Sequence, residues 1–198
     1  MILPRAIADF RKKYPGITVE LMDVGTEQIV DNVRKGSADC GLGTFAPGQE
    51  GVTQVSLVRD KLMMFSASDS LAAEHKVTWA DLAEWPLIAL TKESGIRRLV
   101  EVGYASAQLP CSPAFEVTHI TTALALVEAG LGVAVLPTYA LAAVRNPKVC
   151  GRVVTGPEIS REISMIYASG RSRSPAVTAF EETLRRHAHD VAPDKPRP

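Results

Sequence analysis

Three stretches of the sequence place a hydroxyl or an imidazole where a helix is predicted to begin. They are Thr26, the run Ser94-Gly95-Ile96 and the pair Thr118-His119, and each of them follows a predicted strand. The first N–H groups of a helix have no partner within the helix and carry partial positive charge, so they can bind a carboxylate without help from a charged side chain. Simple N-capping explains each hydroxyl taken singly.

The stretch Gly130-Leu131-Gly132 resembles a glycine-rich loop of the kind that binds phosphate groups. Such a loop follows a strand and precedes a helix, so that the N-terminus of the helix faces the anion. Here a helical pattern precedes Gly130 and a strand pattern follows Gly132, and Val135 occupies the place of a third glycine. We therefore interpret the stretch as a tight corner in which Gly130 ends the helix in the left-handed conformation.

His119 is also a candidate catalytic base. That role would require a nucleophile and an orienting acid, and the sequence contains no Gly-x-Ser-x-Gly motif. The other histidines, His75, His187 and His189, form no His-Glu-x-x-His motif, and the acidic residues do not cluster in a metal-binding pattern. We expect no catalytic residue, no metal site and no cofactor, and we interpret His119 as a histidine at a cleft rim or on the surface.

The charge balance argues against direct binding of nucleic acid by this chain. The 198 residues include 22 basic and 22 acidic side chains, which gives a formal net charge of zero. Basic residues at 11–13, 171–173 and 185–186 fall on separate predicted elements, as expected for solvated helix faces. Arg97 and Arg98 are likewise expected to form a solvated face or an ion pair rather than to anchor a ligand.

Neither a membrane segment nor a secretory signal is evident in the sequence. No apolar run reaches the roughly 18 residues that span a bilayer. The apolar start of the chain is interrupted by Pro4, Arg5 and Asp9, and the basic residues follow the apolar ones rather than precede them. If Met1 is the native start, we expect a cytoplasmic protein.

The three cysteines, Cys40, Cys111 and Cys150, are far apart and form no Cys-x-x-Cys pair. Reduced thiols in a cytoplasmic protein are the simplest interpretation. Cys111, in the loop-like run Leu-Pro-Cys-Ser-Pro, leaves a redox sensor open as an alternative, although such a sensor usually has a resolving partner and an electropositive setting.

The hydrophobic periodicity alternates along the chain between the helical and the strand pattern. Thr26 is predicted as the N-cap of the second helix and Gly36 as its C-terminal stop, and the tail 192–198 is predicted to be disordered. The predicted helices are 3–14, 26–35, 70–75, 79–84, 94–108, 119–130, 138–144 and 174–191, and the predicted strands are 17–24, 38–45, 53–58, 61–68, 86–90, 114–118, 133–137, 149–154 and 161–169.

This order of elements predicts the α/β class, with mainly parallel sheets covered by helices on both faces. It suggests two Rossmann-like subdomains. Subdomain I would comprise residues 1–67 and 168–198, and subdomain II residues 68–167, with crossings near Ser66–Ser68 and Tyr167–Ser169. Two α/β subdomains joined by paired crossings have a hinged cleft between them, which is the usual geometry for capture of a small ligand.

Four segments, in this order and at this spacing, resemble the effector-binding domain of LysR-type transcriptional regulators. They are LPRAIADFRKKYPGITVEL (3–21), KGSADCGLG (35–43), LVEAGLGVAVLP (126–137) and SPAVTAFEETL (174–184), and the resemblance covers residues 2–190. It implies a type 2 periplasmic-binding-protein-like fold, in which a small inducer binds between the subdomains and changes how a separate winged helix-turn-helix domain grips DNA. The stretch 22–43, with Gly25-Thr26 before a helix and Gly41-Leu42-Gly43 in a strand, is most similar to the regulators of aromatic-compound catabolism.

Two features depart from the family pattern. The DNA-binding domain, its linker helix and the first strand of subdomain I are not in this sequence, which begins inside the helix that follows that strand. In the family, the loop after that strand supplies Ser or Thr contacts to the effector, so either part of the site would be missing or the true start would lie upstream. In addition, Thr44 stands where the aromatic-catabolism subgroup often has an arginine that serves an additional carboxylate site.

The three helix N-termini stand at positions where the family binds its effector. The resemblance therefore implies that they form a binding site for a small carboxylate effector. Gly95 would let the ligand approach the backbone, and Ile96 would supply an apolar wall. The resemblance also implies a dimer, to which the helix 26–35 contributes, and a tetramer of the full-length protein. A solute-binding protein of a transporter, which shares the two-part fold, is the alternative. The expected effector-binding residues are Thr26, Thr44, Phe45, Ser94, Gly95, Ile96, Thr118, His119 and Pro137.

Overall fold

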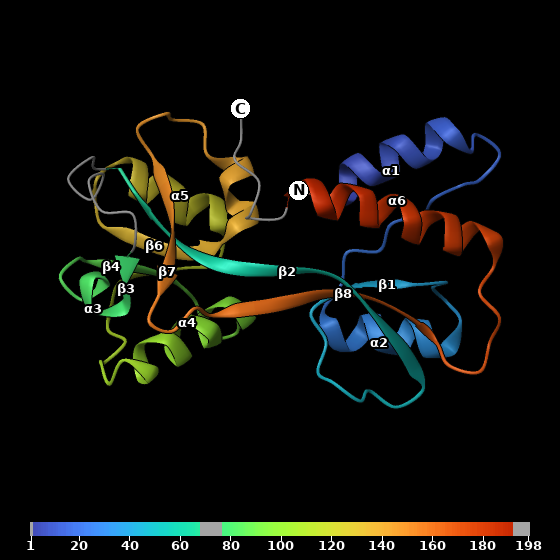
Figure 1. The fold of residues 1–198 in the computed structure, drawn as a ribbon, viewed down its shortest axis with the longest axis horizontal. Coiled ribbons are helices and arrows are strands. Elements are labelled where there is room, and N and C mark those ends of the chain that lie inside the picture. Colours follow the sequence, from blue (N-terminus) through green and yellow to red (C-terminus); the bar gives the residue numbers. More distant parts are fainter. Residues whose placement is uncertain (1, 68–76, 192–198) are drawn as a thin grey trace. The chain divides into compact units, whose positions relative to one another are not determined.

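The computed structural model describes residues 2–67 and 77–191 and is shown as a ribbon in Figure 1. The chain forms two compact units, each built of helices and strands. Unit 1 comprises Met1–Arg59 and Arg161–Pro198, and unit 2 comprises Asp60–Ser160. The predicted α/β class is therefore confirmed. The chain changes unit after Arg59 and again after Ser160, earlier at both points than the crossings predicted from the sequence.

Unit 1 has a small sheet with the strand order β1-β8-β2. Strands β1 and β8 are antiparallel, with Gly41 opposite Ile166 and Gly43 opposite Ser164. The helices of the unit are α1 (Ile2–Lys13), α2 (Thr26–Lys35) and α6 (Pro175–Val191), and its strands are β1 (Gly41–Gly43), β8 (Ser160–Ala168) and the first part of β2 (Val52–Ser66).

Successive residues of β8 face the two sides of this sheet, as the pleat of a strand requires. Met165 packs in a cluster with Ala6 of α1 and Leu184 of α6, whereas Ile166 packs with Val30 and Val33 of α2. Helices α1 and α6 thus cover one face and α2 the other (Figure 1).

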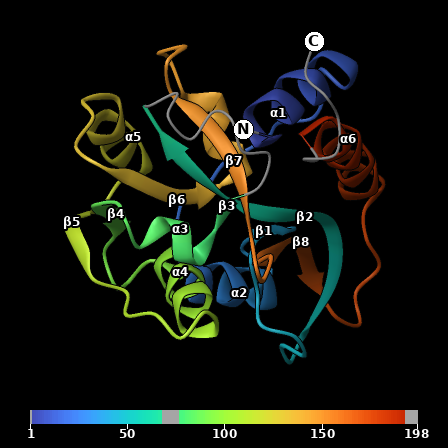
Figure 2. The same cartoon turned by 60° about the vertical axis from the view of Figure 1, so that its left-hand side comes forward.

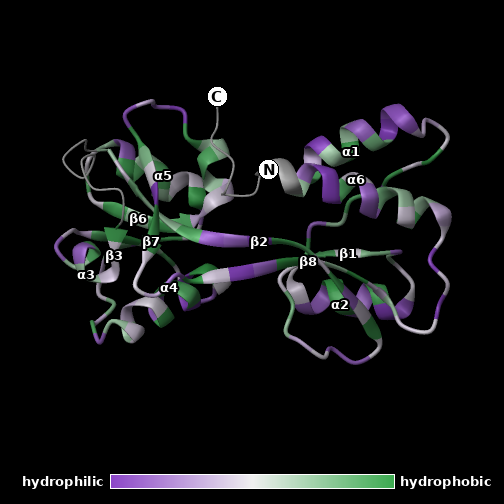
Figure 3. Cartoon of the chain, viewed as in Figure 1, coloured by the Kyte–Doolittle hydropathy of each residue, from purple (hydrophilic) through white to green (hydrophobic). Residues whose placement is uncertain are grey.

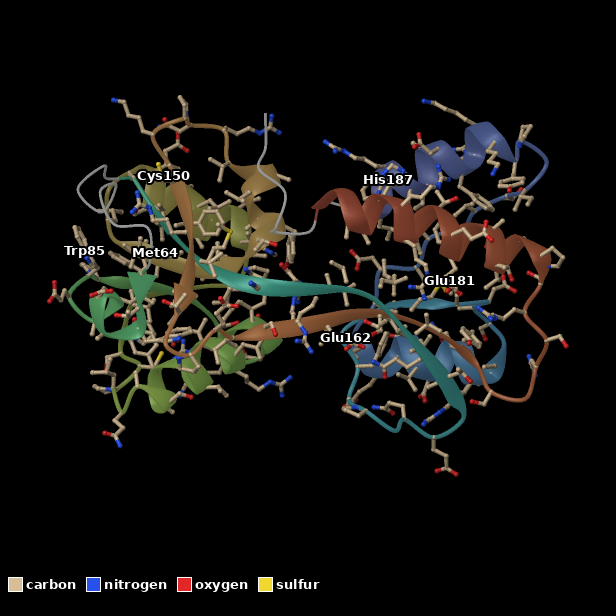
Figure 4. All side chains as sticks on the ribbon, viewed as in Figure 1. Met64, Trp85, Cys150, Glu162, Glu181 and His187 are labelled. Carbon is tan, nitrogen blue, oxygen red and sulfur yellow. The ribbon has the colours of Figure 1, made fainter. Side chains whose placement is uncertain are left out.

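Two further contacts join α6 to α1. The rings of Phe180 and Phe10 meet edge to face at 5.2 Å, and Nε2 of His187 lies 2.9 Å from Oδ2 of Asp9. Figure 4 labels His187 and Glu181 on α6.

The predicted strand 17–24 is wrong. These residues form no strand, and within the described ranges no other strand pairs with them. Leu21 and Met22 are exposed, with 66% and 47% of their surface accessible. An alternating pattern gives a half-buried strand only where a neighbouring strand supplies backbone hydrogen bonds and the sheet supplies a buried face, and this segment has neither.

The N-cap prediction for α2 also needs correction. The N-cap residue is Gly25, and Thr26 is the first residue of the helix. The C-terminal prediction is confirmed, because Gly36 ends the helix with a φ of 77° and donates its backbone N–H toward the carbonyl groups of Asn32 and Val33.

Unit 2 has a sheet of strand order β2-β6-β4-β5, in which β7 also pairs with β2 and with the short β3. The pairs β4–β5, β4–β6 and β3–β7 are parallel, but β2 is antiparallel to both β6 and β7. The elements are β3 (Val77–Thr78), α3 (Trp79–Leu82), β4 (Leu87–Leu90), α4 (Gly95–Ser106), β5 (Pro113–Val117), α5 (Ile120–Glu128), β6 (Val133–Pro137), the 3-10 helix η2 (Thr138–Ala143) and β7 (Cys150–Thr155).

The prediction of mainly parallel sheets is therefore wrong for unit 1, where β1 and β8 are antiparallel. Unit 2 has a mixed sheet, in which three strand pairs are parallel and the two pairs made by β2 are antiparallel. Parallel neighbours need a crossover connection, such as the helices α4 and α5 between β4, β5 and β6. Strands β2 and β8 instead carry the chain from one unit to the other, and they run against their neighbours β6 and β1.

The sheet of unit 2 is buried on both faces. On one face Leu62, Met64 and Trp79 form a cluster with Val100 and Tyr104 of α4. On the other face Met63 and Phe65 pack with Leu124 and Val127 of α5. Figures 1 and 2 show the sheet lying between these two helices from two directions.

Strand β2 is continuous over Val52–Ser66, so the prediction of two separate strands at 53–58 and 61–68 is wrong. Arg59 and Asp60 lie between the two predicted strands, yet Asp60 is buried with 4% of its surface accessible. The predicted helix 70–75, His75 and the predicted disordered tail 192–198 lie outside the described residues.

The interpretation of the Gly130-Leu131-Gly132 stretch as a corner is confirmed. Gly130 has a φ of 74° directly after α5, and Gly132 has a φ of 151° before β6. The carbonyl oxygen of Pro86 accepts a hydrogen bond from the N–H of Val133, and it lies 2.1 Å from where a Cβ of Gly132 would be. Gly132 is thus the residue that lets the corner close onto the start of β4.

Candidate functional site

The carboxyl ends of three strands of unit 2 meet at one edge of the sheet. In the parallel pair β4–β5, Leu90 lies opposite Val117, and the N–H of Thr91 bonds to the carbonyl of Val117 at 3.0 Å. Strand β6 runs parallel to β4 on its other side, so its last residue, Pro137, reaches the same edge. Ligands of open α/β sheets bind at such an edge.

The N-terminus of α4 contributes three predicted site residues to this edge. Ser94 is the N-cap, and its hydroxyl accepts a hydrogen bond from the N–H of Ile96 at 3.2 Å. Gly95 is exposed, whereas Ile96 is buried in the cluster that also contains Leu124 and Val127 of α5. At Ser94, therefore, N-capping is what the structure shows.

The N-terminus of α5 follows the neighbouring strand β5. His119 is its N-cap residue, but its side chain makes no capping hydrogen bond. Thr118 and His119 are both exposed. Because Val117 and Leu90 are paired, the predicted residues on these two helices come together within unit 2.

Unit 1 holds the other predicted site residues. Thr26 is exposed at the start of α2, where no side chain supplies a capping bond because the N-cap is glycine. Thr44 is exposed and directly follows β1. Phe45 is only 7% exposed and packs with Val30 of α2, and its ring lies over Gly43. Phe45 is thus a core residue of unit 1.

Arg97 is buried, with 3% of its surface accessible, and it joins α4 to two strands. Its guanidinium donates to the carbonyl of Leu90 at 3.1 Å, to Glu116 of β5 at 2.7 Å and to Glu101 of α4 at 2.9 Å. Burial opposes its charge, but the hydrogen bonds to Glu116 and Glu101 outweigh that effect and raise the pKa of Arg97. Of the two alternatives predicted for Arg97, the ion pair is confirmed and the solvated face is wrong, because the side chain is buried.

A buried polar pair beside Pro137 was missed by the sequence reasoning. Thr138, the first residue of η2, donates both its N–H and its hydroxyl to Oδ1 of Asp60, at 3.0 and 2.5 Å. Both residues have 4% of their surface accessible. The sequence signal was the acidic residue in the middle of an apolar strand pattern.

The cysteines are free thiols, and Figure 4 labels Cys150 at the start of β7. Burial raises the pKa of Cys111, against the opposing effect of Arg97, and burial together with Asp39 raises the pKa of Cys40 to about 11. A protonated thiol is a poor nucleophile, so these environments disfavour the redox-sensor interpretation of Cys111.

Over residues 2–67 and 77–191, no group of three or more His, Cys, Asp or Glu is placed to hold a metal ion. In the same part of the chain, no helix has the length and apolar character needed to cross a membrane.

The chain is similar to several transcriptional regulators. It is 30% identical over 179 residues to YbhD, an uncharacterized HTH-type transcriptional regulator of Escherichia coli K12, and 26% identical over 186 residues to YfeR of Shigella flexneri. These alignments cover 90% and 93% of this chain but only 56% and 60% of the two relatives. The chain thus spans less than two thirds of the length of these regulators.

Solved structures show the same fold. The effector-binding domain of BenM with its effector benzoate superimposes with a TM-score of 0.83 at 21% identity, covering 99% of this chain and 90% of that one. Full-length CbnR complexed with its target DNA superimposes with a TM-score of 0.76 at 25% identity, covering 94% of this chain and 65% of CbnR.

A family model described as the LysR substrate binding domain accounts for nearly the whole sequence. It matches residues 1–189 and so includes both units and every candidate residue described above. The resemblance inferred from the four sequence segments is confirmed at the level of the family. This chain therefore belongs to the LysR substrate-binding domain family.

Proposed function

We propose that this chain is the ligand-sensing part of a LysR-type transcriptional regulator and that its effector is a small carboxylate. In this proposal, effector binding modulates the grip on DNA of a separate winged helix-turn-helix domain. The proposal includes a cytoplasmic location, because a transcription regulator acts on DNA, and it includes no direct contact between this chain and nucleic acid.

The observation that carries the carboxylate proposal is that no side chain caps the N-termini of α2 and α5. Gly25 has no side chain with which to cap α2, and His119 does not cap α5. Helices of 10 and 9 residues present partial positive charge at these ends. The exposed hydroxyls of Thr26 and Thr118 stand beside them and can donate to a carboxylate oxygen.

The relatives support the same class of ligand. The BenM domain binds benzoate, and the effector-binding domain of QuiR was solved with shikimate, at 20% identity to this chain. Both effectors are small ring-containing carboxylates. We propose an effector of that kind, and with it the finer assignment to regulators of aromatic-compound catabolism.

The contact residues we propose in unit 2 are Ser94, Gly95, Ile96, Thr118, His119 and Pro137, and in unit 1 they are Thr26 and Thr44, with Phe45 supporting them from the core. The proposal also includes a dimer of this chain and a tetramer of the full-length protein. The transporter alternative finds no support among the curated relatives, which are transcriptional regulators.

Thermal unfolding with a matched ligand panel tests the proposal. Each acid, such as benzoate, shikimate or a short aliphatic acid, is paired with its uncharged amide, and the melting temperature of the 198-residue chain is recorded with each. An acid present at 100 times its dissociation constant should add about 2.7 kcal/mol of stability. Stabilisation by the amides alone, or by no member of the panel, would contradict the carboxylate proposal.

Variants then locate the site. Thr26→Val keeps the shape of the side chain and removes the hydroxyl, and it should weaken binding of the stabilising acid about tenfold, as expected for the loss of a hydrogen bond to a charged group. Thr178→Val, at an exposed position on α6, is the matched control and should leave binding unchanged. Equal affinities for Thr26→Val and the control would remove Thr26 from the proposed site.

A further inference from the structure

A buried carboxylate lies in the middle of β2, in the segment where the chain passes from unit 1 to unit 2. Asp60 belongs to the charged run Arg59-Asp60-Lys61, which Figure 3 shows as a hydrophilic section of an otherwise more apolar strand. Arg59 is exposed, but Asp60 has only 4% of its surface accessible. A buried carboxylate is retained only where hydrogen-bond donors replace its water.

Thr138 supplies two of these donors to a single oxygen of Asp60. Its backbone N–H lies 3.0 Å and its hydroxyl 2.5 Å from Oδ1. Thr138 begins η2 directly after Pro137, whose own side chain cannot cap a helix. The carboxylate of Asp60, on strand β2, therefore caps η2 through charge-assisted hydrogen bonds, which are stronger than neutral ones.

The same part of β2 is also bound to the segment through which the chain leaves unit 2. Nζ of Lys61 lies 3.0 Å from Oε2 of Glu158, and the N–H of Leu62 donates to the carbonyl of Ile159 at 3.0 Å. Consecutive residues of β2 thus hold the corner between β6 and η2 on one side and residues 158–159 on the other. A displacement of the corner must displace β2 unless the bonds to Asp60 break.

We propose that Asp60 is a positioning residue for the effector site. Its carboxylate holds the corner between β6 and η2 in one conformation, which sets the affinity for the effector and couples effector binding to β2 at the point where the chain changes unit. This inference rests on the proposed function, which counts Pro137, the residue before Thr138, among the effector contacts.

Amide hydrogen exchange on the chain without ligand tests the positioning role. Asp60→Asn and Thr138→Val each weaken the pair with little change of shape, and exchange in the segment 137–143 should become about tenfold faster than in the parent. Asp60→Ala should have a larger effect. Asp81→Asn is the matched control, because Asp81 also accepts hydrogen bonds from the N–H and the hydroxyl of a threonine, Thr78 at the start of α3 in the same unit, but is only partly buried.

The distribution of the change separates positioning from a general structural role. Faster exchange confined to 137–143, with the control altered only near 78–82, supports the proposal. Exchange that stays unchanged at 137–143, or that rises equally throughout unit 2, would overturn it.

The affinity for benzoate, measured by calorimetry at a temperature where all variants are folded, tests the link to the effector. The dissociation constant should rise about tenfold in Asp60→Asn and Thr138→Val and stay unchanged in Asp81→Asn. An unchanged constant in the first two variants would overturn the link. If benzoate and the rest of the acid panel fail to bind the parent chain, the proposed carboxylate site is wrong and the claimed coupling falls with it, while the exchange data still decide whether Asp60 holds the corner.

Discussion

Both units of this chain cover the two faces of their sheets with helices, but they differ in whether every predicted strand forms. Unit 2 buries both faces of its sheet, under α4 on one side and α5 on the other. Unit 1 has a narrower sheet, and its segment 17–24 carries a strand pattern without a strand, with Leu21 and Met22 exposed. A hydrophobic pattern alone therefore does not make a strand, because a neighbouring strand must supply the backbone hydrogen bonds.

The starts of helices α4 and α2 also differ. In unit 2 the hydroxyl of Ser94 caps its own helix α4, whereas in unit 1 no side chain caps α2 and Thr26 is exposed. Substitution of Ser94 should therefore lower the stability of its unit, and substitution of Thr26 should be better tolerated. Both tryptophans, Trp79 and Trp85, are in unit 2, so their fluorescence reports on that unit alone.

The largest effect is expected at the corner of unit 2. Gly132→Ala would place a Cβ 2.1 Å from the carbonyl oxygen of Pro86, at a φ of 151° that favours glycine. We expect a loss of about 3 kcal/mol in urea unfolding followed by tryptophan fluorescence. Gly130→Ala, with a φ of 74° but open space around the new Cβ, should cost only about 1 kcal/mol. Equal losses in the two variants would show that backbone conformation alone, and not the contact with Pro86, requires the glycine.

The next effect concerns the buried guanidinium. Arg97→Met removes three hydrogen bonds, of which the two to Leu90 and Glu116 join α4 to β4 and β5. Glu101 and Glu116 are 42% and 45% exposed and can be solvated once the arginine is gone, so we expect a cost of about 2 kcal/mol, below that of leaving a fully buried charge unpaired. Arg98→Met, at an exposed position one residue later, should be neutral in the same urea titration. Equal stability of the two variants would contradict a structural role for Arg97.

A smaller effect is expected at the starts of helices α4 and α2. Ser94→Ala removes the capping bond to Ile96 and should destabilise unit 2 by about 1 kcal/mol. Thr26→Ala removes no capping bond, and amide exchange in the first turn of α2 should change by less than about 0.5 kcal/mol. A stability loss for Thr26→Ala as large as that for Ser94→Ala would mean that Thr26 serves its own helix rather than a ligand.

The smallest effect is expected in the segment without a partner. Leu21→Ser replaces a side chain that is 66% exposed. The free energy of unfolding, measured by thermal unfolding followed by circular dichroism, should change by no more than about 0.5 kcal/mol, as for other surface substitutions. Val33→Ser, at a fully buried position of α2 in the same unit, is the contrasting variant and should cost several times more. A loss for Leu21→Ser that matched Val33→Ser would show that the segment 17–24 packs in solution.

Local signals predicted most helices and strands of the chain, and what they missed depends on partners far away in the sequence. The stop at Gly36 and the corner at Gly130 are encoded by neighbouring residues and were predicted correctly. The continuity of β2 through Asp60 depends on Thr138, 78 residues away, and the burial of Arg97 depends on Glu116 of the neighbouring strand. No single-segment pattern contains that information.

The candidate site shows the same limit. The hydroxyls at helix starts could be found from sequence, but which of them cap their own helix could not, because an N-cap position is defined by backbone geometry to within one residue. The N-cap of α2 was predicted at Thr26, one residue after its position in the structure, Gly25. Phe45 was predicted as an effector contact, yet its packing with Val30 makes it a core residue.

The way unit 2 is joined at its two ends has a consequence for engineering. The unit is one uninterrupted stretch, Asp60–Ser160, and backbone and ionic contacts hold its first residues against its last ones, at Leu62 with Ile159 and at Lys61 with Glu158. Its ends are adjacent, so it has the form of a cassette inserted into unit 1. A gene fragment encoding only this stretch, or a permuted version closed by a short linker, is the natural starting point for producing unit 2 by itself.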